Sequence, residues 1–91
     1  SLEAVRVYAK QLFGCLALLQ SCQVIHGDIK PDNILVTEER TSLRLCDFGT
    51  GCLKSEAEVA PYLQSRFYRA PEVMLGLPYG CEIDCWSVAT T

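Results

Sequence analysis

Two short polar segments of the chain hold the residues best suited to chemistry. Residues 26–33 contain Asp28, Lys30 and Asn33, and a second segment begins at Asp47. A carboxylate on a loop can accept the proton of an attacking hydroxyl, and a lysine can neutralise a phosphate. These residue types can meet the needs of phosphoryl transfer, with Asp28 as the base and Lys30 beside the phosphate. Because Mg²⁺ prefers a few oxygen ligands, we expect Asn33 and Asp47 to bind it.

The stretch between the two segments predicts a β-hairpin, which would bring Asn33 and Asp47 together. Residues 34–36 and residues 43–46 predict two short strands, and the polar residues 37–42 predict the turn between them. We expect Gly49 to let the chain turn away from the metal.

Helices and a long loop must position this hairpin. Apolar residues at steps of three and four predict one helix over residues 2–22, and its wide stripe predicts burial on most sides. Residues 24–25 are a short β-branched stretch. Residues 47–65 show no period and predict a long loop, which in compact domains is usually functional. A short helix should open at Pro71, and another should include residues 83–88.

Composition limits the class of protein. The 91 residues carry 8 Lys+Arg against 11 Asp+Glu, a net charge of −3, and 49% are hydrophobic. This composition is globular, and no apolar run reaches the roughly 18 residues of a membrane span. Scattered basic residues predict no direct nucleic-acid binding. The chain begins with Ser and ends inside a predicted helix, so we expect residues 1–91 to be a partial domain. Trp86 is expected in the core.

The cysteines predict a reducing environment. No C-x-x-C pair occurs, and the only histidine lies in the polar loop, so neither a zinc site nor a disulfide framework is favoured. We expect reduced, structural thiols and an intracellular location. The six cysteines are at positions 15, 22, 46, 52, 81 and 85.

Three blocks together resemble the protein-kinase motif set: residues 26–33, residues 47–49 and residues 70–72. Each block alone would be an ordinary loop, turn or helix start, so only their order and joint occurrence carry the resemblance. It implies an α+β segment of the lower kinase lobe, with a long helix, catalytic loop, β-hairpin, activation segment and the start of the next helix. The upper lobe and the later helices are absent from these residues. Lys30-Pro31 follows the Ser/Thr kinase pattern.

The resemblance implies the same chemistry as the residue types. Asp28 matches the catalytic base and Lys30 the phosphate-contacting lysine. Asn33 and Asp47 match the Mg²⁺ ligands, and Leu35 matches the residue that packs beneath the adenine of ATP. These residues are therefore the implied ATP and metal site.

Further residues match supporting positions in the family. His26 and Phe48 match two side chains that stack, and Asp84 matches the aspartate that anchors the catalytic loop. Ser65 matches the hydroxyl that bonds the catalytic aspartate and lysine. Gly27 departs from the pattern, since most kinases have Arg there, which excludes phosphate control through that residue.

Residues 62–72 resemble the CMGC kinases, within them the dual-specificity tyrosine-regulated branch. Residues 26–36 and 45–49 are most similar to the pre-mRNA-processing (splicing) kinase, whereas residues 75–79 are more similar to the homeodomain-interacting type. The exact subfamily therefore stays open.

The same branch implies regulation through Tyr62, which matches a phosphorylated activation-loop tyrosine. A phosphate on Tyr62 would bind guanidinium groups, and Arg66 and Arg69 are near Tyr62 in sequence. Our hypothesis is that this phosphorylation orders residues 50–69.

The resemblance implies that the parent protein is an ATP-dependent serine/threonine kinase of protein substrates, with dual specificity as an open alternative. Splicing or nuclear proteins are the implied substrates, with a nuclear or cytoplasmic location. The alternative is a truncated or pseudokinase-like fragment that acts only as a binding scaffold. We expect the isolated 91 residues to be inactive, because they contain neither a Gly-rich loop nor the strand lysine of the upper lobe.

Overall fold

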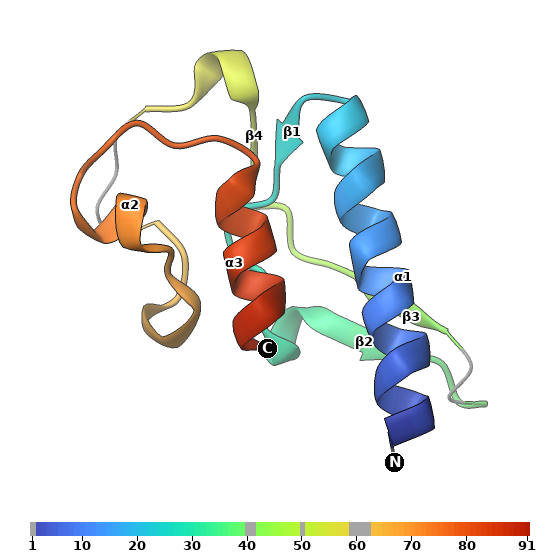
Figure 1. The fold of residues 1–91 in the computed structure, drawn as a ribbon. Helices are drawn as coiled ribbons and strands as arrows, with labels where there is room; N and C mark the ends of the chain where they lie inside the picture. The colour runs from blue at the N-terminus through green and yellow to red at the C-terminus, as the bar shows by residue number, and fades with distance from the viewer. Residues whose placement is uncertain (1, 40–41, 50, 59–62) are drawn as a thin grey trace.

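The computed structural model describes residues 2–39, 42–49, 51–58 and 63–91 (Figure 1). Among these residues the elements run α1 (Leu2–Ser21), β1 (Val24–Ile25), η1 (Pro31–Asn33), β2 (Ile34–Val36), β3 (Leu43–Leu45), β4 (Cys52–Leu53), η2 (Lys54–Glu56), η3 (Arg66–Tyr68), α2 (Pro71–Met74) and α3 (Glu82–Thr90). The η elements are single 3₁₀ turns. The predicted α+β class is confirmed.

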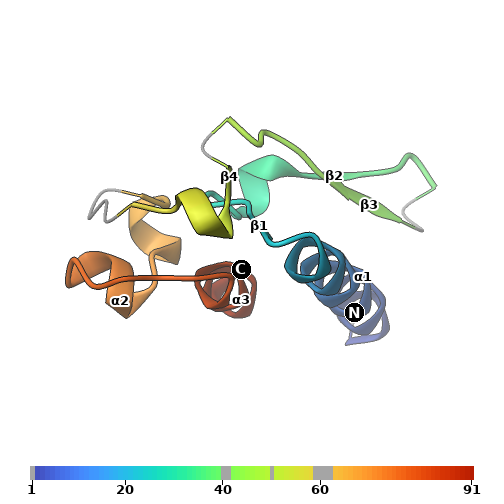
Figure 2. The ribbon, with the colours of Figure 1, turned by 90° about the horizontal axis from the view of Figure 1, so that it is seen from above.

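The helices and strands occupy two layers. Seen from above, α1, α3 and α2 lie in one layer with α3 in the middle, and the strands lie over them (Figure 2). The strands form two small antiparallel sheets, β1 with β4 and β2 with β3. The polar loop that leads from β1 to η1 therefore runs between the hairpin and α3.

The predicted hairpin is confirmed, with Ile34 opposite Leu45 and Val36 opposite Leu43. A side chain of α1 ties it to the helix layer, because Gln11 Oε1 accepts a hydrogen bond of 2.9 Å from the Leu43 N–H. Beneath the hairpin lies the first apolar core cluster, made of Leu12, Ile29, Leu43 and Val88.

The pairing of β1 with β4 was not predicted. Ile25 lies opposite Cys52, at the start of the loop that the sequence left without structure. Gly51 permits the pairing, since a Cβ there would lie 3.0 Å from the carbonyl oxygen of Phe48 and 3.2 Å from that of Ile25. The second core cluster forms on this side of the molecule and consists of Ile25, Ala70, Val73 and Ile83.

The expected burial of α1 on most sides is wrong. Leu12 is its buried residue, whereas Leu2 and Leu18 are 89% and 64% exposed. The physical reason is that, among the described elements, only α3, β1 and β3 contact α1 extensively. Its wide apolar stripe therefore exceeds the surface that the described elements cover. None of the described helices is both long enough and apolar enough to cross a membrane.

Helices α2 and α3 lie where the sequence predicted them, but one residue of α3 that was expected in the core is not buried. Pro71 opens α2 in its first turn, and Gly76 follows the helix in a left-handed conformation, with φ of 70°. In α3, Ile83 and Val88 are buried, but Trp86 is 43% exposed, so its expected place in the core is wrong. All six cysteines are free thiols.

Candidate active site

Asp84 of α3 holds the backbone of the polar loop. Its side chain accepts the His26 N–H at 2.7 Å and the Gly27 N–H at 3.0 Å. Gly27 has a φ of 84°, a conformation that glycine adopts without strain. Asp84 is 1% exposed, and burial raises the pKa of its carboxyl, although the two N–H donors act in the opposite direction. The predicted anchor is therefore present in the structure.

His26 orients the loop from within. The Asp28 N–H donates to His26 Nδ1 at 3.0 Å, which leaves the ring proton on Nε2 to donate to the Cys46 carbonyl at 2.8 Å. The predicted contact with Phe48 is also present, with ring centroids 4.5 Å apart and an interplanar angle of 63°. This edge-on contact ties the loop to the residue that follows Asp47.

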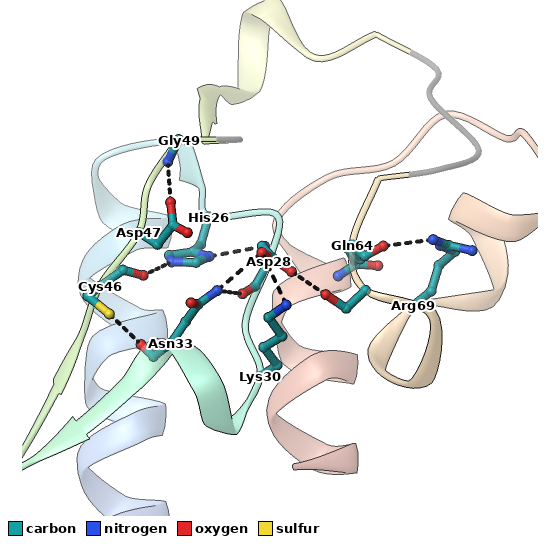
Figure 3. Close-up of polar contacts among 10 residues, drawn as sticks. His26, Asp28, Lys30, Asn33, Cys46, Asp47, Gly49, Gln64 and Arg69 are labelled. Carbon is teal, nitrogen blue, oxygen red and sulfur yellow. Dashed lines mark hydrogen bonds and ion pairs between the residues drawn. The ribbon is translucent and has the colours of Figure 1, made fainter.

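Three side chains converge on the carboxylate of Asp28 (Figure 3). Ser65 Oγ donates to Oδ1 at 2.7 Å, and Asn33 Nδ2 donates to Oδ2 at 3.1 Å. Lys30 Nζ lies 4.0 Å from Oδ2. Because these partners come from the loop, the 3₁₀ turn and the segment after residue 62, tertiary structure fixes the direction of this carboxylate. The structure places the Ser65 hydroxyl on Asp28, as the sequence predicted.

Asp47 lies next to this group without contacting Asp28. The Cys46 N–H donates to the Asn33 carbonyl at 2.9 Å, so Asp47 follows directly after the point where the two segments meet. Its own Oδ1 accepts the Gly49 N–H at 3.3 Å, and its φ of 59° turns the chain there. Figure 3 shows Asn33 reaching toward Asp28, whereas the carboxylate of Asp47 points to Gly49.

The donor set of Asn33 and Asp47 fits Mg²⁺. Asn33 uses its amide nitrogen for both bonds to Asp28, to the backbone oxygen at 2.8 Å and to Oδ2, so the amide oxygen is left for a cation. Asp47 is exposed and offers a second carboxylate oxygen. One amide oxygen and one carboxylate are hard ligands of the kind Mg²⁺ takes beside its waters. Within the described residues no cluster of three or more His, Cys, Asp or Glu forms a metal site.

The remaining predicted residues that the structure describes do not belong to the group of side chains around Asp28. Leu35, in β2, is 57% exposed and available to an apolar ligand. Tyr62 lies outside the described residues. The guanidinium of Arg66 lies over the Phe67 ring, at 5.7 Å, and Arg69 bonds two backbone carbonyls of its own segment. The pairing of these arginines with a phosphate stays a prediction.

Sequence reasoning missed Gln64. Its side chain is buried and hydrogen-bonded to α3. A lone glutamine beside a serine has no local pattern that distinguishes it from a surface residue, so no sequence signal was available.

Comparison with known proteins supports the motif-based interpretation. The model of the protein kinase domain matches residues 1–91. Serine/threonine-protein kinase prp4 of Schizosaccharomyces pombe is 60% identical over 97% of this chain, and serine/threonine-protein kinase prpf4B of Dictyostelium discoideum is 53% identical over 97%. The dual specificity tyrosine-phosphorylation-regulated kinase mbk-2 of Caenorhabditis briggsae is 46% identical over 97%.

The chain spans 18% of the length of the first of these relatives and 11% of the other two. The branch predicted from residues 62–72 is confirmed, because relatives with tyrosine-phosphorylation-regulated names are among the matches. With a family match along its whole length and relatives of this identity, the chain belongs to the protein kinase family.

Proposed function

We propose that the protein carrying this chain is an ATP- and Mg²⁺-dependent serine/threonine protein kinase whose catalytic centre includes Asp28, Lys30, Asn33 and Asp47. The observation that supports this most directly is the convergence of Ser65, Asn33 and Lys30 on one carboxylate. Phosphoryl transfer is mostly positioning and charge neutralisation, and a carboxylate fixed by three partners meets the first requirement.

In this proposal Asp28 orients the hydroxyl of the acceptor residue and takes its proton as the oxygen attacks the γ-phosphorus of ATP. The bond from that phosphorus to the β–γ bridging oxygen breaks, and ADP leaves. Ser65 and Asn33 keep the carboxylate from rotating, so its free lone pairs point at one place. Lys30 lies beside Asp28, where its charge can offset that of the transferring phosphate. Magnesium would be held by Asn33 and Asp47 and would supply neutralisation of the phosphate oxygens.

The substrate class follows from resemblance alone. Similarity of residues 26–36 to the splicing kinase supports protein substrates in splicing or elsewhere in the nucleus, and a nuclear location of the protein. Lys30-Pro31 supports Ser/Thr as the acceptor. ATP and protein are thus the proposed partners.

Replacing Asp28 by Asn in the full-length protein tests the proposal. The amide keeps the shape but cannot accept the proton, so we expect kcat to fall by about 10²–10⁴-fold. The measurement is transfer of radiolabel from γ-labelled ATP to myelin basic protein. Asp32→Asn is the matched control, because Asp32 is exposed on the same loop.

Wild-type turnover in Asp28→Asn would contradict the proposed role of this carboxylate. Absence of transfer by the wild-type protein would instead favour the alternative, a kinase-like scaffold that binds partners without catalysis.

A further inference from the structure

Gln64 has an unusual backbone conformation for a residue that is neither exposed nor glycine. Its φ is 69°, in the left-handed region, and it is 6% exposed. Residues other than glycine rarely adopt this conformation unless the surroundings impose it. The reason for the conformation must therefore be found in the contacts of Gln64.

The carboxamide of Gln64 makes three hydrogen bonds in the interior. Nε2 donates to the Ile83 carbonyl at 2.9 Å and to Ser87 Oγ at 2.7 Å, both in α3. Oε1 accepts the Ala70 N–H at 2.8 Å, just before α2. Ser87 Oγ in turn donates to the Tyr68 carbonyl at 2.7 Å. A single side chain thus joins the segment of residues 63–70 to α3.

The backbone on either side of the turn is held as well. Arg69 donates from Nε to the Leu63 carbonyl at 2.9 Å and from Nη2 to the Gln64 carbonyl at 2.8 Å. Figure 3 shows Arg69 reaching back to Gln64 across the loop. Side chain and backbone contacts together fix the left-handed turn.

The turn determines where the next residue points. Ser65, which follows Gln64, has an extended backbone with φ of −74° and ψ of 145°. Its hydroxyl donates to Asp28 Oδ1 at 2.7 Å. If residue 64 took an ordinary negative φ, the chain direction at Ser65 would change and the hydroxyl would leave the carboxylate. The contact on Asp28 therefore depends on the carboxamide bonded to α3.

We propose that Gln64 is a positioning residue. Its buried carboxamide anchors residues 63–70 to α3 and thereby holds the Ser65 hydroxyl on Asp28. The proposal deepens the function proposed above and rests on it for its kinetic consequence. It makes α3 a common support for the site, since α3 holds the loop through Asp84 and the segment through Ser87.

A double-mutant cycle in the full-length protein tests this. Gln64→Met removes the carboxamide at similar size, and Ser65→Ala removes the hydroxyl. We expect each to lower kcat by about tenfold or more with a smaller change in the KM for ATP, and the double variant to be no worse than the single ones. The assay is radiolabel transfer from γ-labelled ATP to myelin basic protein.

Gln23→Met is the matched control. Gln23 also has a left-handed φ, of 57°, but it is exposed and its amide bonds only the neighbouring turn, at the Gln20 carbonyl. We expect wild-type kcat for this variant. Additive effects of Gln64→Met and Ser65→Ala, or an unchanged kcat in Gln64→Met, would overturn the proposal.

Two further measurements keep the test decisive. Ser87→Ala deletes one partner of the carboxamide while Ile83 remains, so if Gln64→Met fails to fold, Ser87→Ala takes its place in the cycle with the same expected coupling to Ser65. Hydrogen exchange of residues 63–70 needs no activity. We expect Gln64→Met to speed exchange of the Ala70 amide by about fivefold, because that N–H loses its one acceptor. We expect Ser65→Ala to leave exchange of the Ala70 amide unchanged.

These readouts separate the two proposals. A wild-type protein without phosphate transfer would defeat the proposed function, and exchange alone would then decide whether Gln64 anchors the segment. Unchanged exchange in Gln64→Met would overturn the anchoring in either case.

Discussion

The polar loop of residues 26–33 and the helix α1 differ in how the molecule holds them. The loop has almost no regular structure, yet His26, Gly27 and Asn33 are buried and hydrogen-bonded. Helix α1 is regular over its whole length, yet Leu12 is its one buried side chain. Throughout the described residues, every buried side-chain nitrogen or oxygen has a hydrogen-bond partner.

The difference shows that polar contacts hold the side chains and backbone of the loop in place, whereas α1 is held mainly through one apolar residue. A hydrogen bond to a buried group fixes direction as well as distance, whereas apolar contact fixes only proximity. A site that must aim a carboxylate is therefore built on the loop, and α1 serves as a support beneath the hairpin.

Replacing Asp84 by Ala should remove the anchor of the polar loop and cause the largest loss of stability among these variants. Two buried N–H groups, of His26 and Gly27, would lose their acceptor, so we expect a loss of about 3 kcal/mol in the free energy of unfolding. Urea-induced unfolding of the full-length protein measures it. Asp32→Ala, on the exposed side of the loop, should change stability by less than about 0.5 kcal/mol. Similar values for the two variants would show that the anchor contributes little.

A matched pair of leucines tests the helix side. Leu12→Ala removes buried methyl groups from the first core cluster and should cost about 2–3 kcal/mol. Leu18→Ala, on the same helix but 64% exposed, should cost less than about 0.5 kcal/mol. Urea-induced unfolding of the two variants checks this. Equal losses would mean that both faces of α1 are covered in the full-length protein.

The smallest expected effect is one of pH. Burial raises the pKa of Asp84 more than its N–H donors lower it, so the folded protein binds this proton more tightly than the unfolded chain does. The resulting stability is complete below the unfolded pKa and is lost as pH rises through the folded one.

We therefore expect the wild-type protein to lose stability relative to Asp84→Asn as the pH rises from about 3.9, the ordinary aspartate value. Urea-induced unfolding at a series of pH values measures the difference. If the wild-type protein instead gained stability relative to Asp84→Asn as the pH rises, the two N–H donors would outweigh burial in setting the pKa of Asp84.

Much of this arrangement could be predicted from local patterns. The period of residues 2–22 predicted α1, the two apolar runs predicted the hairpin, and Pro71 predicted the start of α2, because these signals lie within a few neighbouring residues. Motif order predicted which side chains gather near Asp28. The pairing of β1 with β4 was not predicted, because it joins two-residue strands that are far apart in sequence. No local pattern specifies such a partner.

Residue types and their order thus determined the family, the helices and hairpin, and the candidate base, lysine and metal ligands. Tertiary structure decided that Trp86 and most of α1 lie at the surface, and that Gln64 is buried. It also decided that the Ser65 hydroxyl lies 2.7 Å from the Asp28 carboxylate, closer than Lys30 at 4.0 Å. The reason is that burial and hydrogen bonding depend on elements remote in sequence, which only the folded chain brings within reach.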